Sequence, residues 1–361
     1  MVAPLGPPPA EAAEAQQSQP VGYVIGNDGR LYDSSFRAPV ISDVMAPPGA
    51  GLATFRESDG SLSAFAIGTQ GGLVMTTPTY NRPGYTLALD GASGVAVPGA
   101  PLSAVSDRGS AYVFFVGRSG ALFRAAYRQP ARPSGGPQPI SASGIAPSGG
   151  IVAAVTSPTS APGVVFVGSN GALYSTWSTS SGAWTTVQKS PANVAQPGGG
   201  VAAVPTGSRV QVFFTGRDGS LWSASISAGP LPDPWVPVVF SQAGLVPSGA
   251  SLAAARLSDD ALAVLFAGTD GAIRVVANLN GQWQGPSAVT PAGVARPGIP
   301  LAVGVAGGEL SSDWCGNDVL WWWRWRWPGP PPPLPWYGEI SQIRVSTPGL
   351  VRDGFNVSLT L

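Results

Sequence analysis

The sequence predicts an all-β protein built from repeated units, because two short phrases recur along it at a nearly constant spacing. The first phrase is a turn that most often reads Gly-x-Asp/Asn-Gly-x-Leu. Successive copies begin 42 to 52 residues apart, at Gly26, Gly68, Gly117, Gly168, Gly216, Gly268 and Gly316. A repeat of this length is typical of solenoids, propellers and arrays, so it decides the fold class before any single element does.

The second phrase is a turn that ends in glycine and precedes an apolar run. Its copies end at Gly49, Gly99, Gly149, Gly198, Gly249, Gly298 and Gly354. Each of the first six lies 18 or 19 residues before the next turn phrase. The first turn phrase has no such partner before it, and Gly354 has no turn phrase after it. We therefore expect residues 350–361 to supply a strand to the first unit, beside the strand that ends near Ile25. Such pairing closes a ring, whereas a linear solenoid would end in polar caps.

Each unit has room for four short strands. In the third unit the expected strands are residues 102–105, 111–116, 121–127 and 138–143. The turn phrase joins the second and third strands, and its Gly and Asn/Asp residues suit the positive φ of tight hairpins. The strand candidates are short, β-branched and aromatic, and no stretch has a sustained helical period with caps. Four strands in each of seven closed units predict a seven-bladed β-propeller with four-stranded blades.

The propeller is expected to form a single domain over residues 19–361. Residues 1–18, rich in proline and alanine, are expected to be a flexible tail. This segment has neither the basic nor the apolar region of a signal peptide. No apolar run of about 18 residues occurs, so no membrane span is expected. Cys315 is the single cysteine, so an internal disulfide is impossible and the compartment is left undecided.

The composition argues against several classes of function. Lys and Arg total 19 and Asp and Glu total 19, without the basic stripe of a nucleic-acid-binding protein. There is no histidine, which removes the commonest general base, the usual catalytic triads and most zinc sites. One acidic residue per turn falls short of the six to eight oxygens of a calcium site. No carboxylate pair has the pattern of a glycoside hydrolase. We therefore expect no catalytic residue, no cofactor and no metal.

Aromatic residues recur at two positions of the unit. One position opens the predicted fourth strand and holds Phe36, Tyr85, Trp184, Trp235, Trp283 and Trp336. The other follows the Leu of the turn phrase and holds Tyr32, Phe123, Tyr174, Trp222 and Trp321. Such rings can pack between neighbouring blades, or they can be platforms for the C–H-rich faces of sugar rings. Both interpretations stay open, and the second makes candidate ligand-binding residues of Trp184, Trp235, Trp283, Trp336, Trp222 and Tyr174.

Residues 20–361 resemble the seven-bladed bacterial propeller lectins of the Photorhabdus type. The phrases that carry this resemblance are Phe214-Thr-Gly-Arg-Asp-Gly-Ser-Leu221 and Phe266-Ala-Gly-Thr-Asp-Gly-Ala-Ile273, followed by Trp235 and Trp283. The resemblance implies multivalent binding of fucose-like or related sugars in grooves between blades, usually by oligomers. The second and third units depart from the pattern, with Tyr85 or no aromatic residue at the platform position.

Two functions therefore remain open. One is a non-catalytic, lectin-like protein that binds glycans, and the other is a structural or protein-interaction propeller without sugar binding. Residues 312–336 favour a contact with a second copy or a protein partner, since they contain seven of the twelve tryptophans. A locally shifted reading frame is another interpretation. The chain has 18 Arg for one Lys, which indicates a gene with GC-rich codons. Val319 stands where the other turn phrases have Gly, so we expect a different turn geometry there.

Overall fold

Every element that the computed structural model describes is a β-strand. The described residues are 21–33, 38–56, 62–76, 86–88, 93–107, 109–128, 132–133, 135–157, 160–179, 181–233, 235–258, 261–279, 281–306, 309–316, 319–326, 339–343 and 357–360. Among them, no helix is long and apolar enough to cross a membrane. The predicted tail, residues 1–18, lies outside this set, so the domain boundaries stay a prediction.

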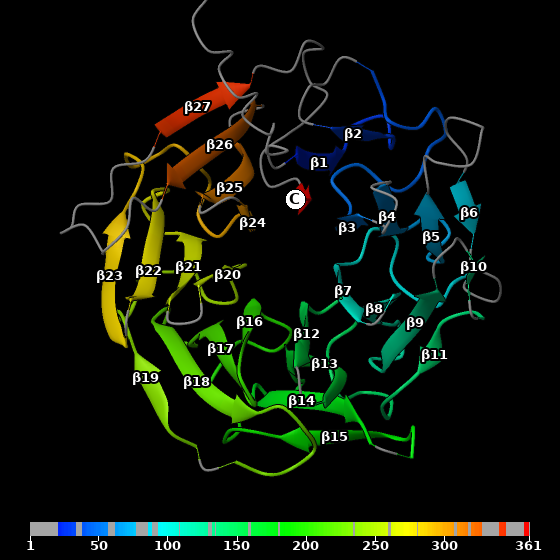
Figure 1. The fold of residues 1–361 in the computed structure, drawn as a ribbon, viewed down its shortest axis with the longest axis horizontal. Helices are drawn as coiled ribbons and strands as arrows, with labels where there is room; N and C mark the ends of the chain where they lie inside the picture. Colours follow the sequence, from blue (N-terminus) through cyan, green and yellow to red (C-terminus); the bar gives the residue numbers. More distant parts are fainter. Residues whose placement is uncertain are drawn as a thin grey trace, which may run out of the picture.

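The first sheet joins the two ends of the chain. Its strand order is β2 (Leu31–Asp33), β1 (Val21–Ile25) and β28 (Val357–Thr360). β1 and β28 are antiparallel, with Val21 opposite Thr360 and Val24 opposite Val357. The C-terminal strand lies beside the central axis in Figure 1. The prediction that the C-terminal residues pair with the strand before Gly26 is confirmed.

Among the described residues, six further sheets follow in chain order, and in each of them successive strands lie farther from the central axis (Figure 1). The second sheet contains β3 (Leu52–Arg56), β4 (Leu62–Ile67), β5 (Leu73–Thr76) and β6 (Thr86–Ala88). The third contains β7 (Leu102–Asp107), β8 (Ser110–Val116), β9 (Leu122–Arg128), β10 (Arg132–Pro133) and β11 (Gln138–Pro139). The fourth contains β12 (Val152–Ser157), β13 (Ser160–Val167), β14 (Leu173–Ser178) and β15 (Trp184–Gln188).

The fifth sheet contains β16 (Val201–Thr206), β17 (Arg209–Thr215), β18 (Leu221–Ser227) and β19 (Pro237–Val239). The sixth contains β20 (Ala253–Ser258), β21 (Ala261–Ala267), β22 (Ile273–Leu279) and β23 (Gln282–Ala288). The last contains β24 (Ala302–Ala306), β25 (Glu309–Gly316), β26 (Val319–Arg326) and β27 (Glu339–Ile343). β26, which holds four of the clustered tryptophans, pairs on both sides and is therefore an interior strand of its blade.

The predicted fourth strand of the third unit, residues 138–143, is too long. β11 stops at Pro139, and β10 also pairs with β9. Pairing ends where the Ile140 N–H donates to the Leu122 carbonyl and the Ser141 hydroxyl accepts from the Leu122 N–H. The Ser141 side chain thus accepts the bond that a backbone carbonyl would accept if the strand continued, and the pairing with β9 ends there.

The turn phrases form the hairpins that the sequence predicts. In the β17–β18 hairpin the Gly216 N–H donates to the Ser220 carbonyl at 2.8 Å, and an Asp218 carboxylate oxygen accepts from the Ser220 N–H at 3.0 Å. Gly219 has a φ of +77°, and a Cβ there would lie 2.5 Å from the Val246 carbonyl oxygen. Asp218 therefore caps its own turn. Gly219 suits this position because it adopts a positive φ without strain and has no Cβ to clash with the Val246 carbonyl.

The last hairpin has a different geometry, as predicted from Val319. Gly316 pairs directly with Val319, so Val319 belongs to β26 instead of the turn. Asn193 is the sole non-glycine residue with positive φ among the described residues. Val319 therefore carries no left-handed strain, and replacing it with glycine is expected to give no stabilisation.

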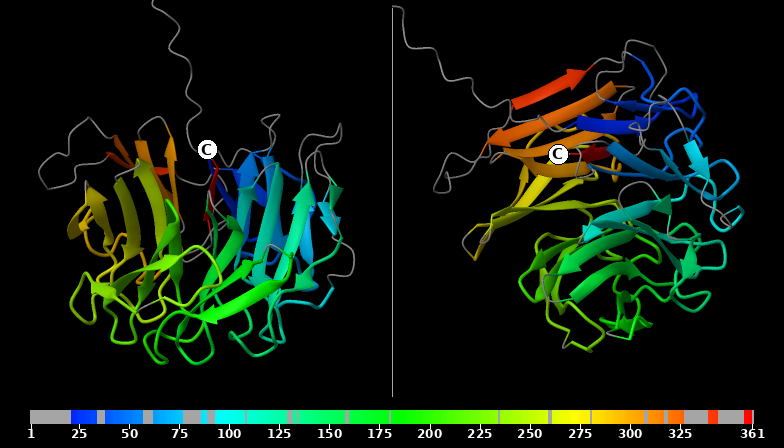
Figure 2. Two further views of the ribbon diagram at one scale, coloured as in Figure 1. Left: turned by 60° about the horizontal axis from the view of Figure 1, so that its bottom comes forward. Right: turned by 45° about the vertical axis from the view of Figure 1, so that its right-hand side comes forward.

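Neighbouring sheets pack face to face around the axis, as Figure 2 shows from two further directions. Phe114 and Val116 of β8 share one hydrophobic cluster with Val164 and Phe166 of β13. Each fully buried side chain of this kind contributes about 1.5–3 kcal/mol. Backbone bonds also tie the blades together, such as the one from the Gly200 N–H to the Gly249 carbonyl. Radial sheets that pack in this way form a β-propeller.

Candidate functional site

The fourth-strand tryptophans lie in grooves between neighbouring blades. Trp184 opens β15 as predicted and lies directly opposite Ser178. Its ring meets Phe114 of the preceding blade edge-on, at 5.8 Å between centroids and an interplanar angle of 68°. Trp184 is half-buried, so it combines packing between blades with some access to solvent.

Trp283 repeats this arrangement two blades further on. It is the second residue of β23, lies opposite Asn278 and is half-buried. Its ring meets Phe213 of the preceding blade at 5.8 Å and 76°, and it contacts Phe240 at 4.5 Å. Trp184 and Trp283 therefore occupy equivalent places in their grooves.

Trp235 lies in a groove that apolar side chains already fill. It precedes β19 and contacts Phe214 at 5.9 Å. Extending the Ala224–Pro237 pair by two residues on both strands places Ile226 opposite Trp235. Trp177 of the preceding blade is fully buried in the same cluster, directly across from Gly163. A Cβ on that glycine would lie 2.4 Å from the indole ring, so the ring lies directly over Gly163, and it packs in the same cluster as Ile226 and Trp235.

The two candidates that follow a turn phrase make their ring contacts and hydrogen bonds within their own blades. Tyr174 stacks on Phe166 at 5.5 Å, and its hydroxyl bonds Asn170 and Gln188 at 2.9 Å each. Trp222 lies over Phe214 at 6.1 Å, and its indole N–H donates to the Ser220 hydroxyl. These contacts favour the packing interpretation.

Trp336, which completes the predicted site residues, lies outside the described residues, as do Phe36 and Tyr85.

A pocket of about 210 Å³ lies in the groove between the β16–β19 and β20–β23 blades. Its lining combines hydroxyl, amide and guanidinium groups with a small apolar wall, and consists of Thr206, Arg256, Ser258, Ala261, Leu262, Asn278 and Gly281. Because directly opposed residues share a face of the sheet, the Asn278–Trp283 pair places Trp283 in the same groove as the pocket. None of the lining residues carries a carboxylate.

Arg256 connects the two walls of this pocket. Its Nε donates to the Ser258 carbonyl at 3.0 Å within its own blade. Its Nη1 donates to the Pro205 carbonyl of the neighbouring blade at 3.4 Å. The guanidinium is thereby held at the pocket wall, where it contributes positive charge and donors.

Sequence reasoning missed these polar residues. The signal that could have found them is a comparison of one register position across three units, which holds Ser178, Ile226 and Asn278. Ile226 lies in the groove that is filled by apolar side chains, and Asn278 lines the pocket. A polar residue at this position therefore indicates a groove with room for a ligand.

The groove of Trp184 has a different chemistry. The Arg124 guanidinium lies 5.5 Å from the Trp184 ring centroid and 5.9 Å from that of Tyr112. These are cation–π distances. The Arg124 Nε is buried and has no hydrogen-bond partner. This groove therefore holds a positive charge between two rings.

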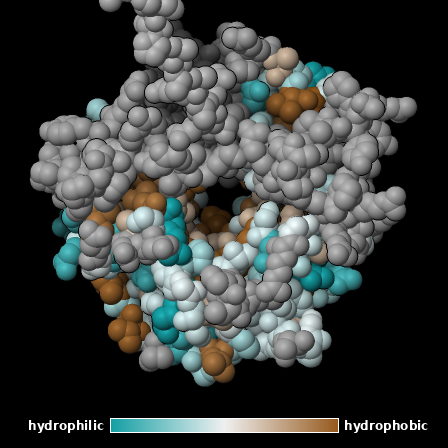
Figure 3. All heavy atoms as spheres, in the orientation of Figure 1, coloured by the Kyte–Doolittle hydropathy of each residue, from teal (hydrophilic) through white to brown (hydrophobic). Residues whose placement is uncertain are grey.

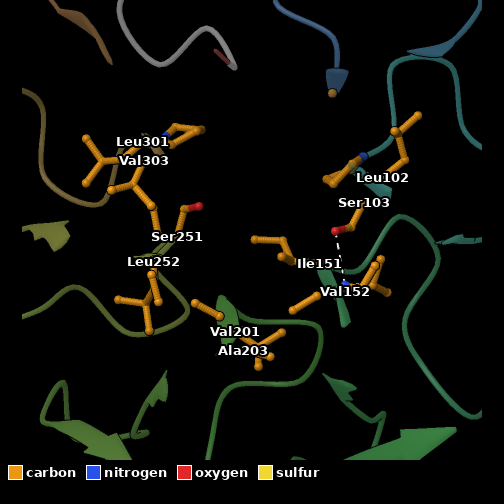
Figure 4. A pocket seen from close by; sticks show the side chains of 18 of the residues that line it. Leu102, Ser103, Ile151, Val152, Val201, Ala203, Ser251, Leu252, Leu301 and Val303 are labelled. Carbon is orange, nitrogen blue, oxygen red and sulfur yellow. Dashed lines mark hydrogen bonds between the residues drawn. The ribbon is translucent and has the colours of Figure 1, made fainter. Parts of the chain in front are cut away.

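The central channel forms a cavity with a volume of about 550 Å³ (Figure 4). Its walls come from the innermost strands, and the labelled side chains are mostly aliphatic, among them Leu102, Val152, Val201 and Leu252. The Ser103 hydroxyl accepts the Ala154 N–H at 3.0 Å, so it is engaged in linking two blades. No charged side chain lines this channel among the described residues.

The turn carboxylates are committed to the fold. Hydrogen bonds from Ser220, first through its hydroxyl and then its backbone, hold the pKa of Asp218 below its usual value. Burial works to raise the pKa of Asp270, but hydrogen bonds from Ala272 and Arg274 and the charge of Arg274 outweigh it and lower the pKa. No group of three or more potential metal ligands occurs in the described part of the chain.

No protein-family model matches the sequence, and no curated protein matches it. Solved structures do. The BP39L lectin from Burkholderia pseudomallei is 27% identical, with a TM-score of 0.72 over 84% of this chain and 90% of that one. The SapL1 lectin, solved with alpha methyl fucoside, is 17% identical, with a TM-score of 0.57 over 82% of this chain and 96% of that one.

A fungal lectin from Aleuria aurantia, described as a six-bladed β-propeller with a novel fucose recognition mode, is 14% identical. Its TM-score is 0.51 over 82% of this chain and 96% of that one. At such identities the SapL1 and Aleuria structures support the fold alone, and the fold that they support is a β-propeller.

Proposed function

We propose that this protein is a non-catalytic, lectin-like propeller that binds a neutral sugar in the groove between the β16–β19 and β20–β23 blades. The observation that carries the proposal is the polar pocket in the groove that Trp283 shares. The likeness to the BP39L lectin supports the same class of ligand.

The chemistry of the pocket suits a monosaccharide. Thr206, Ser258 and Asn278 offer both donors and acceptors for sugar hydroxyls. Arg256 adds donors for a ring or hydroxyl oxygen, and Ala261 and Leu262 provide a surface for C–H groups. A site of about 210 Å³ is smaller than the usual drug-sized pocket, so one site alone binds weakly.

Finer features belong to the same proposal. A fucose-like sugar is the first ligand to test, because structural neighbours are described with fucose or a fucoside. The groove of Trp184, Tyr112 and Arg124 is a second candidate site. A ring of seven blades and a closer relation to the Photorhabdus-type lectins are supported by the sheet closed by β28 together with the six sheets that follow it.

Calorimetric titration with methyl α-L-fucoside, and then a glycan array, tests the proposal. Asn278→Ala is expected to weaken binding at least tenfold, because it removes a donor and an acceptor from the pocket. Ser287→Ala is the matched control, since Ser287 lies on the same pair of strands, opposite Val275 on the other face. If no monosaccharide binds, or if Asn278→Ala and Ser287→Ala behave alike, the proposed site is wrong.

A further inference from the structure

Large hydrophobic side chains are exposed around one outer strand. Leu231 is 67% exposed and Val236 69%, and both precede β19. Val238 and Val239, inside the strand, are 45% and 51% exposed. Figure 3 shows hydrophobic surface at the rim of the ring, over the position of β19 in Figure 1. Two other exposed large hydrophobic residues among those described, Val44 and Val97, lie elsewhere on the chain.

A buried ion pair holds the segment that leads into β19, joining Asp233 of this segment to Lys189 of the neighbouring blade. Lys189 has no exposed side-chain surface, and Asp233 has 5%. The Lys189 ammonium donates to the Asp233 carboxylate at 2.8 Å and also to the carbonyls of Gly229 and Leu231. Asp233 in turn accepts the N–H and hydroxyl of Ser227. The exposed apolar residues therefore stand on an anchored segment.

The hydrogen-bonding groups of β19 show which residues face outward. The Phe240 N–H donates to the Leu221 carbonyl at 2.9 Å, so the bonded positions on β19 alternate from Phe240 to Val238. Pro237 and Val239 lie between them and point their backbone groups away from β18. β19 ends its sheet, with no described strand beyond it. The outer edge therefore offers a Val239 N–H and the carbonyls of Pro237 and Val239.

We propose that β19 pairs with β19 of a second copy of this chain, antiparallel and about a two-fold axis at Val238. In this register Val239 of each copy lies opposite Pro237 of the other. Each Val239 N–H then donates to the facing Pro237 carbonyl. The return bond to the Val239 carbonyl is absent, because proline has no N–H, so each Val239–Pro237 pair forms one hydrogen bond instead of two. The inference is independent of sugar binding.

Side chains favour a second copy as the occupant. Residues 236–240 include no charged residue, so like charges do not meet across the two-fold axis. Val238 meets Val238 of the partner copy, and Val236 comes opposite Phe240, as β-branched and aromatic cross-strand pairs do. A two-fold contact of this kind is closed, because the same patch is used by both copies.

Sedimentation velocity of the full chain over a range of concentrations tests this. We expect a dimer that Val239→Pro and Val238→Lys each weaken at least tenfold. Val239→Pro removes the outward donor without taking a bond from β18, and Val238→Lys places two charges on the axis. Val44→Lys is the matched control, since Val44 is 57% exposed and distant in sequence, and it is expected to leave the dimer intact.

Circular dichroism shows whether each variant is folded. One folded variant is enough to decide whether the dimer forms through β19. Hydrogen exchange adds a local readout, because the Val239 amide is expected to be protected in the dimer and unprotected in Val238→Lys. A wild-type chain that stays monomeric at every concentration overturns the proposal. So does a dimer that survives either substitution in a folded variant, since another surface then holds it together. A monomer that binds an extended peptide at β19 assigns the edge to a different partner and also overturns it.

Discussion

The three fourth-strand tryptophans share a place in the repeat but have different surroundings. Trp283 shares its groove with a polar pocket, and Trp184 lies against a guanidinium. Trp235 lies among Trp177 and Ile226 in a hydrophobic cluster. A recurring aromatic residue therefore predicts the place of a groove, whereas the residues across from it decide whether the groove can hold a polar ligand.

This difference gives a prediction for single substitutions. Trp235→Ala is expected to lower the free energy of unfolding by about 2 kcal/mol, because a half-buried ring leaves a cluster. The sugar affinity of the folded protein should then change less than twofold. Trp283→Ala should weaken sugar binding at least fivefold. Denaturant unfolding and calorimetry on the same samples measure both effects. If Trp235→Ala impairs binding as much as Trp283→Ala does and leaves stability unchanged, Trp235 is a platform after all.

The Lys189–Asp233 pair predicts a pH dependence of stability. Burial works to raise the pKa of Asp233, but the hydrogen bonds from Lys189 and Ser227 and the charge of Lys189 outweigh it and lower the pKa. A carboxylate with a lowered pKa in the folded state adds stability above its unfolded pKa, about 4. That contribution disappears as the pH falls through the folded value.

Asp233→Asn tests this pair. At neutral pH the substitution should lower the free energy of unfolding by about 3–5 kcal/mol, because Lys189 then keeps a buried charge without its partner. The difference from wild type should shrink as the pH falls below about 4, where the unfolded carboxyl begins to bind a proton. Urea unfolding over a pH series measures it. A difference that stays constant to the lowest pH would falsify this assignment.

At the scale of elements, the hairpins were predictable, whereas the lengths of the outer strands were not. The turn phrase specifies its hairpin locally, through glycine at positive φ and an Asp, Asn or Ser side chain that caps the turn. The fourth strands pair on one side and vary in length, from two residues in β11 to seven in β23. Because little of such a strand is fixed by its own sequence, its length depends on side chains such as Ser141 that end the pairing.

The same reasoning explains what could be predicted of the site. The aromatic residues recur at fixed positions in most units and can be counted along the chain. The pocket combines Thr206 of one blade with Ser258 and Asn278 of the next blade, and Thr206 lies more than 50 residues before either of them in sequence. No local pattern joins such residues, so the pocket becomes visible when the blades are placed side by side.

Two glycines of one blade test the element-scale argument. Gly219→Ala introduces a Cβ at a φ of +77° and 2.5 Å from the Val246 carbonyl oxygen, so it is expected to cost at least about 2 kcal/mol. Gly207→Ala is the control. It lies in the β16–β17 hairpin at a φ of +64° with open space around it, and should cost about 1 kcal/mol from backbone strain alone. Thermal and urea unfolding compare the two. Equal losses would show that the contact with Val246 is relieved at no cost.

At the scale of the whole molecule, the repeat yields one ring whose grooves are not equivalent. One groove contains a polar pocket, one holds Arg124 between two rings, and one is filled by Trp177. The number of sugar sites is therefore expected to be smaller than the number of grooves. Avidity for clustered glycans would then come from the few open grooves, and from a second ring where two copies pair through β19.

Ring closure is the property of the whole molecule that the sequence predicts most directly, and it can be tested by truncation. β28 pairs with β1 from Val21 to Val24 and lies innermost in its sheet. Removing residues 350–361 leaves β1 with an unpaired edge and the ring open, and an exposed edge strand promotes aggregation. The truncated chain is expected to melt at a lower temperature and to form soluble aggregates in size-exclusion chromatography. Removing residues 1–18, the predicted tail, is the control and should leave both measurements unchanged. A chain without residues 350–361 that melts like the full chain, with no new oligomer, would mean that the ring holds together without its closing strand.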